Sequence, residues 1–378
     1  MKLKDIGKIV TGKTPSTKQL ENFSELDDKY LFVTPRDMKD NCKYIESTER
    51  YLTSFVEDKF KSQIIKKDSV CISCIGSDMG KVYMINRPGI TNQQINSITD
   101  IKDICNPHYL YYYFSDKKEY LKGIAGGSTM PILNKSTFEN IEIDLPARNI
   151  QDKIVKILNN IDNKIELNNQ TNDNLFKIGD QLYFENFDKY KKELPDGYRI
   201  VKLGDAVSNY DSKRKPMSSR ERELHQGLYP YYGATSIIDY VDDYIFDDTY
   251  LLMGEDGTVK TDEGYPVLQY IWGKNWINNH AHVLKGEKIS TEFLVFALRK
   301  INIESMITGA VQPKINQENM NKIEFVIGTE SKNREYENIF TNIMNKYKNI
   351  IEENKRLEQL RDILLPKLMN GEINLDKI

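Results

Sequence analysis

The chain has 378 residues, of which 39% are hydrophobic and 29% charged, and its formal net charge is −3. These values are typical of a soluble protein with two or three domains, and the near balance of charge excludes binding to nucleic acid through overall positive charge. Because the sequence has neither an apolar run of about 18 residues nor an amino-terminal signal peptide, we expect a cytoplasmic protein.

The second half of the chain repeats the first. A shift of 182 residues aligns Pro131 with Pro313, and the match continues through two long segments, residues 150–185 and 332–369. A repeat of this length predicts two similar units, each ending in a long helix. We therefore predict an α+β fold with two pseudo-repeated mixed α/β domains and two long helices. The predicted boundaries are 1–146 for the first domain, 147–192 for the central helix, 193–328 for the second domain and 329–378 for the carboxyl-terminal helix.

The first domain carries clear local signals. Residues 69–75 and 81–85 predict a β-hairpin between glycines. Asn106 and the proline after it predict a helix start. Residues 141–146 alternate between apolar and polar side chains, which predicts an edge strand ended by proline. Segments of the second domain repeat this order, with residues 251–254 in the place of the first hairpin strand.

The four cysteines, Cys42, Cys71, Cys74 and Cys105, all lie in the first half. We expect reduced thiols, as in cytoplasmic proteins. The Cys71-x-x-Cys74 spacing has no second pair, so burial in a strand is favoured over a zinc or redox site.

The long helices each carry one apolar stripe whose spacing alternates between four and three residues, the pattern of a coiled-coil seam. Each stripe needs an apolar partner, and the other helix supplies one. Asn172 and Asn354 share one seam position, where they either fix the register as buried amides or are solvated. The predicted seam residues are Ile154, Leu158, Ile161, Ile165, Asn172, Leu175, Leu182, Ile343, Tyr347, Ile350, Asn354, Leu357 and Leu364.

Three motifs that suggest chemistry are rejected on context. Residues 7–14 match the Walker A pattern, but too few residues precede them for a buried strand, and Pro15 disfavours the helix that should follow. Asn106-Pro107-His108-Tyr109 differs by one residue from an amino-methyltransferase signature and is better explained as a helix start. His280 and His282 share a strand face, but the chain has too few histidines to complete a metal site, so an edge-strand pair or DNA contacts are favoured. We predict no catalytic or metal site.

Basic, amide and hydroxyl side chains in predicted loops are candidates for contacts with DNA phosphates and base edges. The alternative for each is a solvated loop or turn. The candidates are Lys13, Thr14, Ser16, Lys18, Arg36, Lys81, Asn92, Gln93, Gln94, Ser128, Lys135, Lys213, Arg214, Lys215, Ser218, Ser219, Arg220, Tyr232, His280, His282, Gln312 and Lys314.

Several segments together resemble the specificity subunit of type I restriction-modification systems. They are Leu145-Pro146 with the following Gln-Asp-Lys-Ile, residues 229–236 (YPYYGATS), 252–257 (LMGEDG) and 278–283 (NNHAHV), and residues 357–373 (LEQLRDILLPKLMNGEI). The resemblance covers essentially the whole chain, including its two-half plan.

The resemblance implies that each domain is a target-recognition domain that reads one half of a bipartite site in double-stranded DNA. It implies that the two helices pack antiparallel and fix the spacer between the half-sites. Two modification subunits would carry S-adenosylmethionine and methylate adenine, restriction subunits would use ATP and Mg²⁺, and this chain would hold no cofactor.

Two alternatives remain open from the sequence. The chain could serve a related stand-alone or type II-like methyltransferase complex, or it could be a coiled-coil scaffold without DNA readout. An ATPase that uses residues 7–14, a motif rejected above on context, predicts nucleotide binding by the isolated chain.

Overall fold

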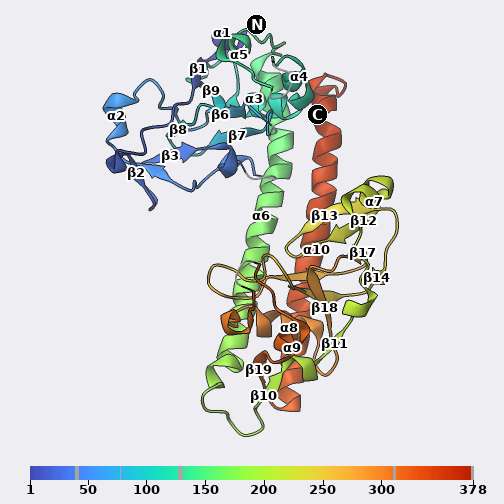
Figure 1. Ribbon diagram of the computed structural model, residues 1–378. Helices are drawn as coiled ribbons and strands as arrows, with labels where there is room; N and C mark the ends of the chain where they lie inside the picture. Colours follow the sequence, from blue (N-terminus) through green and yellow to red (C-terminus); the bar gives the residue numbers. More distant parts are fainter. Residues whose placement is uncertain (39–41, 77, 127–130, 310–311, 376–378) are drawn as a thin grey trace. The chain divides into compact units, whose positions relative to one another are not determined.

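The fold is α+β, as predicted, and Figure 1 shows it as a computed structural model. The chain divides into two compact units, which we call unit 1 (residues 1–166 and 354–378) and unit 2 (residues 167–353). The two long helices are α6 (Arg148–Asn186) and α10 (Glu330–Met369). Each contributes one segment to unit 1 and another to unit 2. The described residues are 1–38, 42–76, 78–126, 131–309 and 312–375.

Unit 1 contains a five-stranded sheet in the order β1-β9-β6-β7-β4 and a four-stranded sheet in the order β2-β5-β3-β8. The predicted hairpin is confirmed as antiparallel β6 and β7, with Gly76 and Gly80 at φ +83° and +85° in the turn. Both glycines therefore adopt a conformation that other residues rarely take. The strands are β1 (Lys8–Thr11), β2 (Phe23–Ser24), β3 (Tyr30–Val33), β4 (Tyr44–Ile45), β5 (Tyr51–Leu52), β6 (Val70–Ser73), β7 (Val82–Ile85), β8 (Gly89–Thr91) and β9 (Ile95–Thr99).

Short helices pack against the two sheets of unit 1. The predicted helix start at Asn106 is confirmed, because its side chain accepts a hydrogen bond from the His108 backbone N–H at 2.9 Å. Leu110 and Phe114 then pack in the core beneath the helix. The helices are α1 (Leu3–Ile6), α2 (Val56–Lys59), α3 (Pro107–Ser115), α4 (Lys118–Gly123) and α5 (Lys135–Glu139), with single 3-10 turns at Leu20–Asn22 and Pro35–Asp37.

The predicted edge strand at residues 141–146 is wrong. Only an isolated bridge between Lys2 and Glu142 forms there. Ile141 and Ile143 are buried as the alternation suggests, but only the first residues of the chain lie beside them. The segment therefore lacks the neighbouring strand that a ladder requires.

Unit 2 contains three sheets, in the orders β11-β18-β15-β16, β13-β12-β17-β14 and β10-β19. The strands are β10 (Arg199–Lys202), β11 (Val207–Asn209), β12 (Gln226–Tyr232), β13 (Ile237–Val241), β14 (Phe246–Asp247), β15 (Tyr250–Gly254), β16 (Leu268–Ile271), β17 (Lys274–Ile277), β18 (Ala281–Gly286) and β19 (Glu324–Ile327). The helices are α7 (Ser219–Leu224), α8 (Thr291–Leu298) and α9 (Gln317–Asn321), and 3-10 turns lie at Asp188–Tyr190, Leu203–Asp205, Asp211–Lys213 and Glu304–Met306.

The repeat seen in the sequence is present in the backbone hydrogen bonds. In unit 1 the Leu3 N–H donates to the Ile141 carbonyl at 3.0 Å, and in unit 2 the Leu203 N–H donates to the Ile323 carbonyl at 2.8 Å. Asn134 caps α5 and Asn316 caps α9 through the same side-chain contact. The two units are therefore built on one scaffold.

Within each unit, the segments of α6 and α10 run antiparallel. In unit 1, Ile154 and Leu158 pack with Leu368, and Lys153 donates to the Leu375 carbonyl at 2.8 Å. In unit 2, the Phe176 ring lies 5.0 Å from the Tyr347 ring. The predicted seam side chains are all buried or half-buried.

Asn172 and Asn354 are 6% and 7% exposed. The solvated interpretation of these two amides is therefore wrong.

In the described part of the chain, none of the helices has the length and hydropathy that a membrane span requires.

Candidate DNA interface

The sheet of unit 1 brings distant candidate residues to one end. Strands β1 and β6 end there and β9 and β7 begin there, because each neighbouring pair is antiparallel. Lys13 and Thr14 follow β1, Asn92 to Gln94 precede β9, and Lys81 precedes β7. We call this set of loops sheet end 1.

A hydrogen bond joins two loops of sheet end 1. The Thr14 hydroxyl lies 2.7 Å from the amide oxygen of Gln93, which is exposed. The Asn92 side chain accepts from the Gln94 backbone N–H at 3.1 Å and donates to the Gln94 amide oxygen at 2.9 Å. These contacts order a row of amides at the surface.

Arg36 lies beside this row. It occupies a 3-10 turn after β3, and β3 pairs with the parallel strand β8 so that Val33 faces Thr91. The Asn92 N–H donates to the Val33 carbonyl at 2.9 Å. The exposed guanidinium is thus available for an anion next to the amides.

The remaining candidates of the first half are more dispersed. Ser16 and Lys18 are exposed in the loop after β1. Lys81 pairs with Asp78 at 3.2 Å, and Lys135 pairs with Glu139 at 3.4 Å on α5. Ser128 lies outside the described residues.

Unit 2 repeats the arrangement in the sheet β11-β18-β15-β16. Strands β11 and β15 end, and β18 and β16 begin, at one end. We call it sheet end 2. Residues 211–215 follow β11, Asn278 to His280 precede β18, and Lys314 bridges to Asp256 after β15. The turn is the same as in unit 1, since the Asn278 side chain accepts from the His280 backbone N–H at 2.8 Å.

The basic loop of residues 211–215 divides into two kinds of side chain. Lys213 and Lys215 are exposed, with the Lys213 ammonium 4.9 Å from the Tyr210 ring. Arg214 is turned inward, with a side chain 12% exposed that binds Glu255 at 2.6 Å. Arg214 therefore makes its contacts within the protein. This corrects the prediction that it is free to contact DNA phosphates.

His282 also departs from the prediction, because it is 1% exposed on β18, and β18 lies between β11 and β15. The predicted edge-strand pair of histidines is thus wrong. His280 is exposed and pairs with Asp256 instead.

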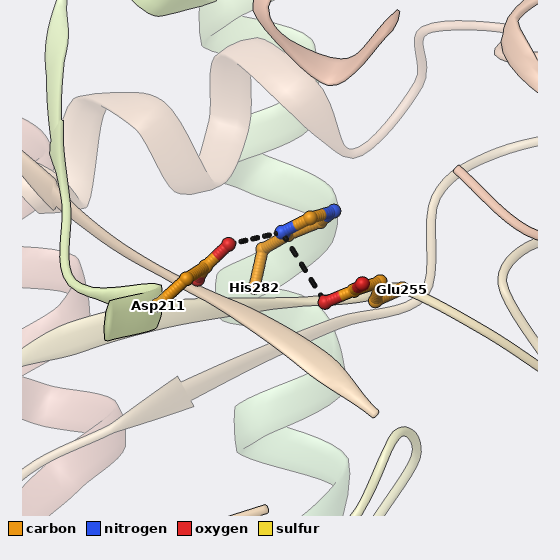
Figure 2. Close-up of side chains that lie close together, drawn as sticks. All are labelled: Asp211, Glu255 and His282. Atoms are coloured by element: carbon orange, nitrogen blue, oxygen red, sulfur yellow. Dashed lines mark hydrogen bonds and ion pairs between the residues drawn. The ribbon is translucent and has the colours of Figure 1, made fainter. Parts of the chain in front are cut away.

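Figure 2 shows His282 between two carboxylates, those of Asp211 and Glu255. Its Nδ1 lies 2.6 Å from Asp211 Oδ2 and 3.7 Å from Glu255 Oε2, and its Nε2 lies 2.9 Å from the Ile315 carbonyl oxygen. Burial acts to raise the pKa of Asp211, but the hydrogen bond and charge of His282, together with hydrogen bonds to Val283 and Asn209, hold that pKa below its ordinary value. We call these three residues with Arg214 the unit 2 anchor.

The Asp211, Glu255 and His282 ligand atoms are close enough together to surround a cation. However, Arg214 and Lys314 already neutralise Glu255, at 2.6 Å and 3.2 Å, and His282 Nε2 faces a carbonyl oxygen. The donor set thus suits an ion-pair network better than a metal site. Sequence reasoning missed Asp211 and Glu255. Glu255 directly follows β15, and Asp211 lies two residues after the end of β11.

The other candidates of the second half lie on separate elements. Ser218 caps α7 by accepting from the Glu221 N–H at 3.3 Å, and Ser219 and Arg220 are exposed in its first turn. Tyr232 is half-buried at the end of β12, and burial raises its pKa to about 12. Gln312 is exposed, and Lys314 is exposed while paired with Glu255.

The rejected motifs have structural roles. Lys8 to Thr11 of the Walker A pattern form β1, and residues 12–16 directly after them are not helical. Their backbone groups are therefore used in the sheet and do not form a phosphate loop. Cys71 and Cys74 are buried at β6, which raises their thiol pKa values to about 12 and about 11.

Comparison with known proteins gives one consistent result. A family model described as type I restriction modification DNA specificity domain matches residues 1–176 and 195–361. The MjaIX type I restriction enzyme specificity subunit of Methanocaldococcus jannaschii is 26% identical over 411 residues, covering 100% of this chain and 94% of that protein. The HindI specificity subunit of Haemophilus influenzae is 37% identical over 174 residues, covering 43% of this chain and 37% of that protein.

A solved structure shares the fold. The crystal structure of a type I restriction-modification S subunit from M. genitalium matches with a TM-score of 0.59 and 18% identity, covering 97% of this chain and 95% of that one. At this identity the match concerns the fold alone.

Proposed function

The chain belongs to the type I restriction modification DNA specificity family, and from this premise we propose that it reads a bipartite site in double-stranded DNA. Its relatives are named specificity subunits, which agrees with a targeting subunit that is not itself an enzyme. The proposal is that each unit reads one half-site, and that the chain positions modification and restriction subunits on the DNA.

The observation that carries this proposal is the recurrence of one surface in both units. Sheet end 1 and sheet end 2 each present an ordered asparagine turn before a central strand, beside exposed basic residues. Amides suit the hydrogen-bonding edge of adenine, and lysine and arginine suit phosphates. The two ends differ in side chains, which suits two unequal half-sites.

Repeated apolar positions on the long helices support the assembly part of the proposal. Ile178 of α6 is 52% exposed and Leu360 of α10, which is 182 residues further on, is 45% exposed. A single exposed apolar side chain is common on protein surfaces, but its recurrence at the equivalent position of both helices suits an interface. Two equivalent positions suit two copies of one partner, which we propose is the modification subunit. That partner would carry S-adenosylmethionine, and restriction subunits would carry ATP and Mg²⁺.

The experiment compares methylated adenines genome-wide in cells that express the modification subunits with and without this chain. We expect a bipartite methylated motif only when the chain is present. If methylation occurs at the same sites without it, or if the chain adds no sequence preference, the proposal fails and a scaffold role is favoured.

A further inference from the structure

The unit 2 anchor has a counterpart in unit 1 at the same ladder positions. Ser73 pairs with Ile95 in unit 1 and Gly254 pairs with Ala281 in unit 2, so Cys74 corresponds to Glu255 and Asn96 to His282. The pairing of Lys8 with Thr99 and of Ser208 with Lys285 similarly makes Thr11 correspond to Asp211.

The contacts of these counterparts are also the same. The Thr11 hydroxyl donates to Asn96 Oδ1 at 2.7 Å, as Asp211 contacts His282. Asn96 Nδ2 donates to the Leu133 carbonyl at 3.2 Å, as His282 Nε2 contacts the Ile315 carbonyl at 2.9 Å. One buried polar side chain thus ties the end of β1 in unit 1, and the turn after β11 in unit 2, to the loop before the last short helix of the same unit.

The two anchors differ in charge. The unit 1 anchor is neutral, made of a hydroxyl, an amide and a thiol. In unit 2 the Ile315 carbonyl can only accept, so His282 Nε2 donates to it, and Nδ1 faces the Asp211 carboxylate. The imidazole lies within a charged cluster that also contains Glu255, Arg214 and Lys314.

The anchor fixes the basic loop from inside. Arg214 Nη1 donates to the Ala281 carbonyl at 2.6 Å, its Nε donates to the Asp211 carbonyl at 3.1 Å, and Asp211 Oδ1 accepts from the Val283 N–H at 2.8 Å. The Trp276 indole N–H donates to the Lys215 carbonyl at 2.6 Å. With the backbone held at these points, the side chains of residues 213 and 215 are exposed.

We infer that His282 is a positioning residue, which through Asp211 holds residues 211–215 so that Lys213 and Lys215 present their charges to DNA. This inference rests on the proposed function. Without the imidazole, the Asp211 carboxylate loses its buried side-chain partner, so the loop is released.

The test uses the complex of this chain with its modification subunits and a labelled duplex that carries the methylated motif. Affinity is measured at several salt concentrations, because its salt dependence reports the number of phosphate contacts, for the unchanged chain, His282→Asn and the double variant Lys213→Ala/Lys215→Ala. We expect the double variant to lower the slope of log affinity against log salt by about 2, about one for each lysine. We expect His282→Asn to lower the slope by about the same amount.

Two controls make the result specific. His225→Asn removes an exposed histidine that is not among the DNA-contact candidates and should leave the salt slope unchanged. Adding His282→Asn to the Lys213→Ala/Lys215→Ala variant should cause no further loss, because the charges that His282 positions are already absent. If His282→Asn does not fold, Asp211→Asn breaks the same contact from the other side and should lower the salt slope in the same way.

Several outcomes would overturn the inference. They are a double lysine variant whose salt slope equals that of the unchanged complex, a salt slope of His282→Asn that matches the unchanged one, and losses that add in the combined variant. A failure of the proposed function is distinguishable, since the unchanged complex would then show no preference for the motif at any salt concentration.

Discussion

Gly179 lies inside α6, where glycine costs about 1 kcal/mol of helix stability relative to alanine. A β-carbon at this position would meet Phe296 Cε1 at 2.1 Å, in the buried contact between α6 and α8. The absence of a side chain therefore allows the phenyl ring to pack directly on the helix.

We predict that Gly179→Ala lowers the free energy of unfolding by about 1–3 kcal/mol, because the ring or the helix must shift. The matched control is Gly123→Ala at the end of α4, where a β-carbon meets no heavy atom within 4 Å. That variant should be neutral or raise stability by about 0.5 kcal/mol. Denaturant unfolding measures both, and equal effects would refute the packing explanation.

The cysteines differ in their expected reactivity. Burial raises the thiol pKa of Cys71 and of Cys105 to about 12, and that of Cys74 to about 11, whereas Cys42 is exposed. Because only the thiolate reacts, we predict that a thiol reagent at about pH 8 modifies Cys42 rapidly and the others only after denaturation. Cys42→Ser should abolish the fast phase. Fast labelling of more than one thiol would contradict the burial of the other three.

At the scale of elements, one layer of the helix pair differs between the units. In unit 1, Arg361 of α10 binds Asp162 of α6 at 3.2 Å, and Tyr112 of α3 donates to the same carboxylate at 2.5 Å. In unit 2 the positions related by the 182-residue shift are Gly179 and Met344, which are apolar. The ionic layer thus distinguishes the helix segments of unit 1 from those of unit 2.

We predict that Arg361→Met lowers stability by about 3 kcal/mol, because it leaves the Asp162 carboxylate, 12% exposed, without its cation. The double variant Asp162→Leu/Arg361→Met should recover most of that loss, since neither member of the ion pair is then left without the other. Denaturant unfolding of the three proteins forms the test. A double variant as unstable as the single one would show that the layer matters through shape and not through charge.

The elements with strong local signals were predictable. The seam spacing predicted α6 and α10, Asn106 predicted the start of α3, and the glycines predicted the β6–β7 hairpin. The strand at residues 141–146 failed because a strand needs a neighbour, which its own sequence does not reveal. The predictions for Arg214 and His282 failed for a related reason. Both side chains point inward because their partners come from segments distant in sequence. Aligning Asn96 with His282 through the repeat could have identified both anchors.

At the scale of the whole molecule, we propose that helix length sets the spacer between the half-sites. Helix α6 has 39 residues, which at about 1.5 Å each corresponds to about 58 Å, more than one DNA turn of about 34 Å. Deleting seven residues from each helix, 166–172 and 349–355, removes about 10 Å, or roughly three base pairs.

We predict that this double deletion shortens the unread spacer of the methylated motif and leaves both half-sites unchanged. Methylome sequencing reads the spacer directly. A deletion protein that still methylates the original spacing would show that the helices do not set the distance.

The central claim is that each unit reads its own half-site, and methylome sequencing of two matched variants tests it most directly. One variant carries Arg36→Ala and Gln93→Ala at sheet end 1, and the other carries Lys213→Ala and Lys215→Ala at sheet end 2. We predict that the first relaxes or weakens recognition of one half-site only and that the second affects only the other. If both variants alter the same half-site, or if neither alters the motif, the claim is contradicted.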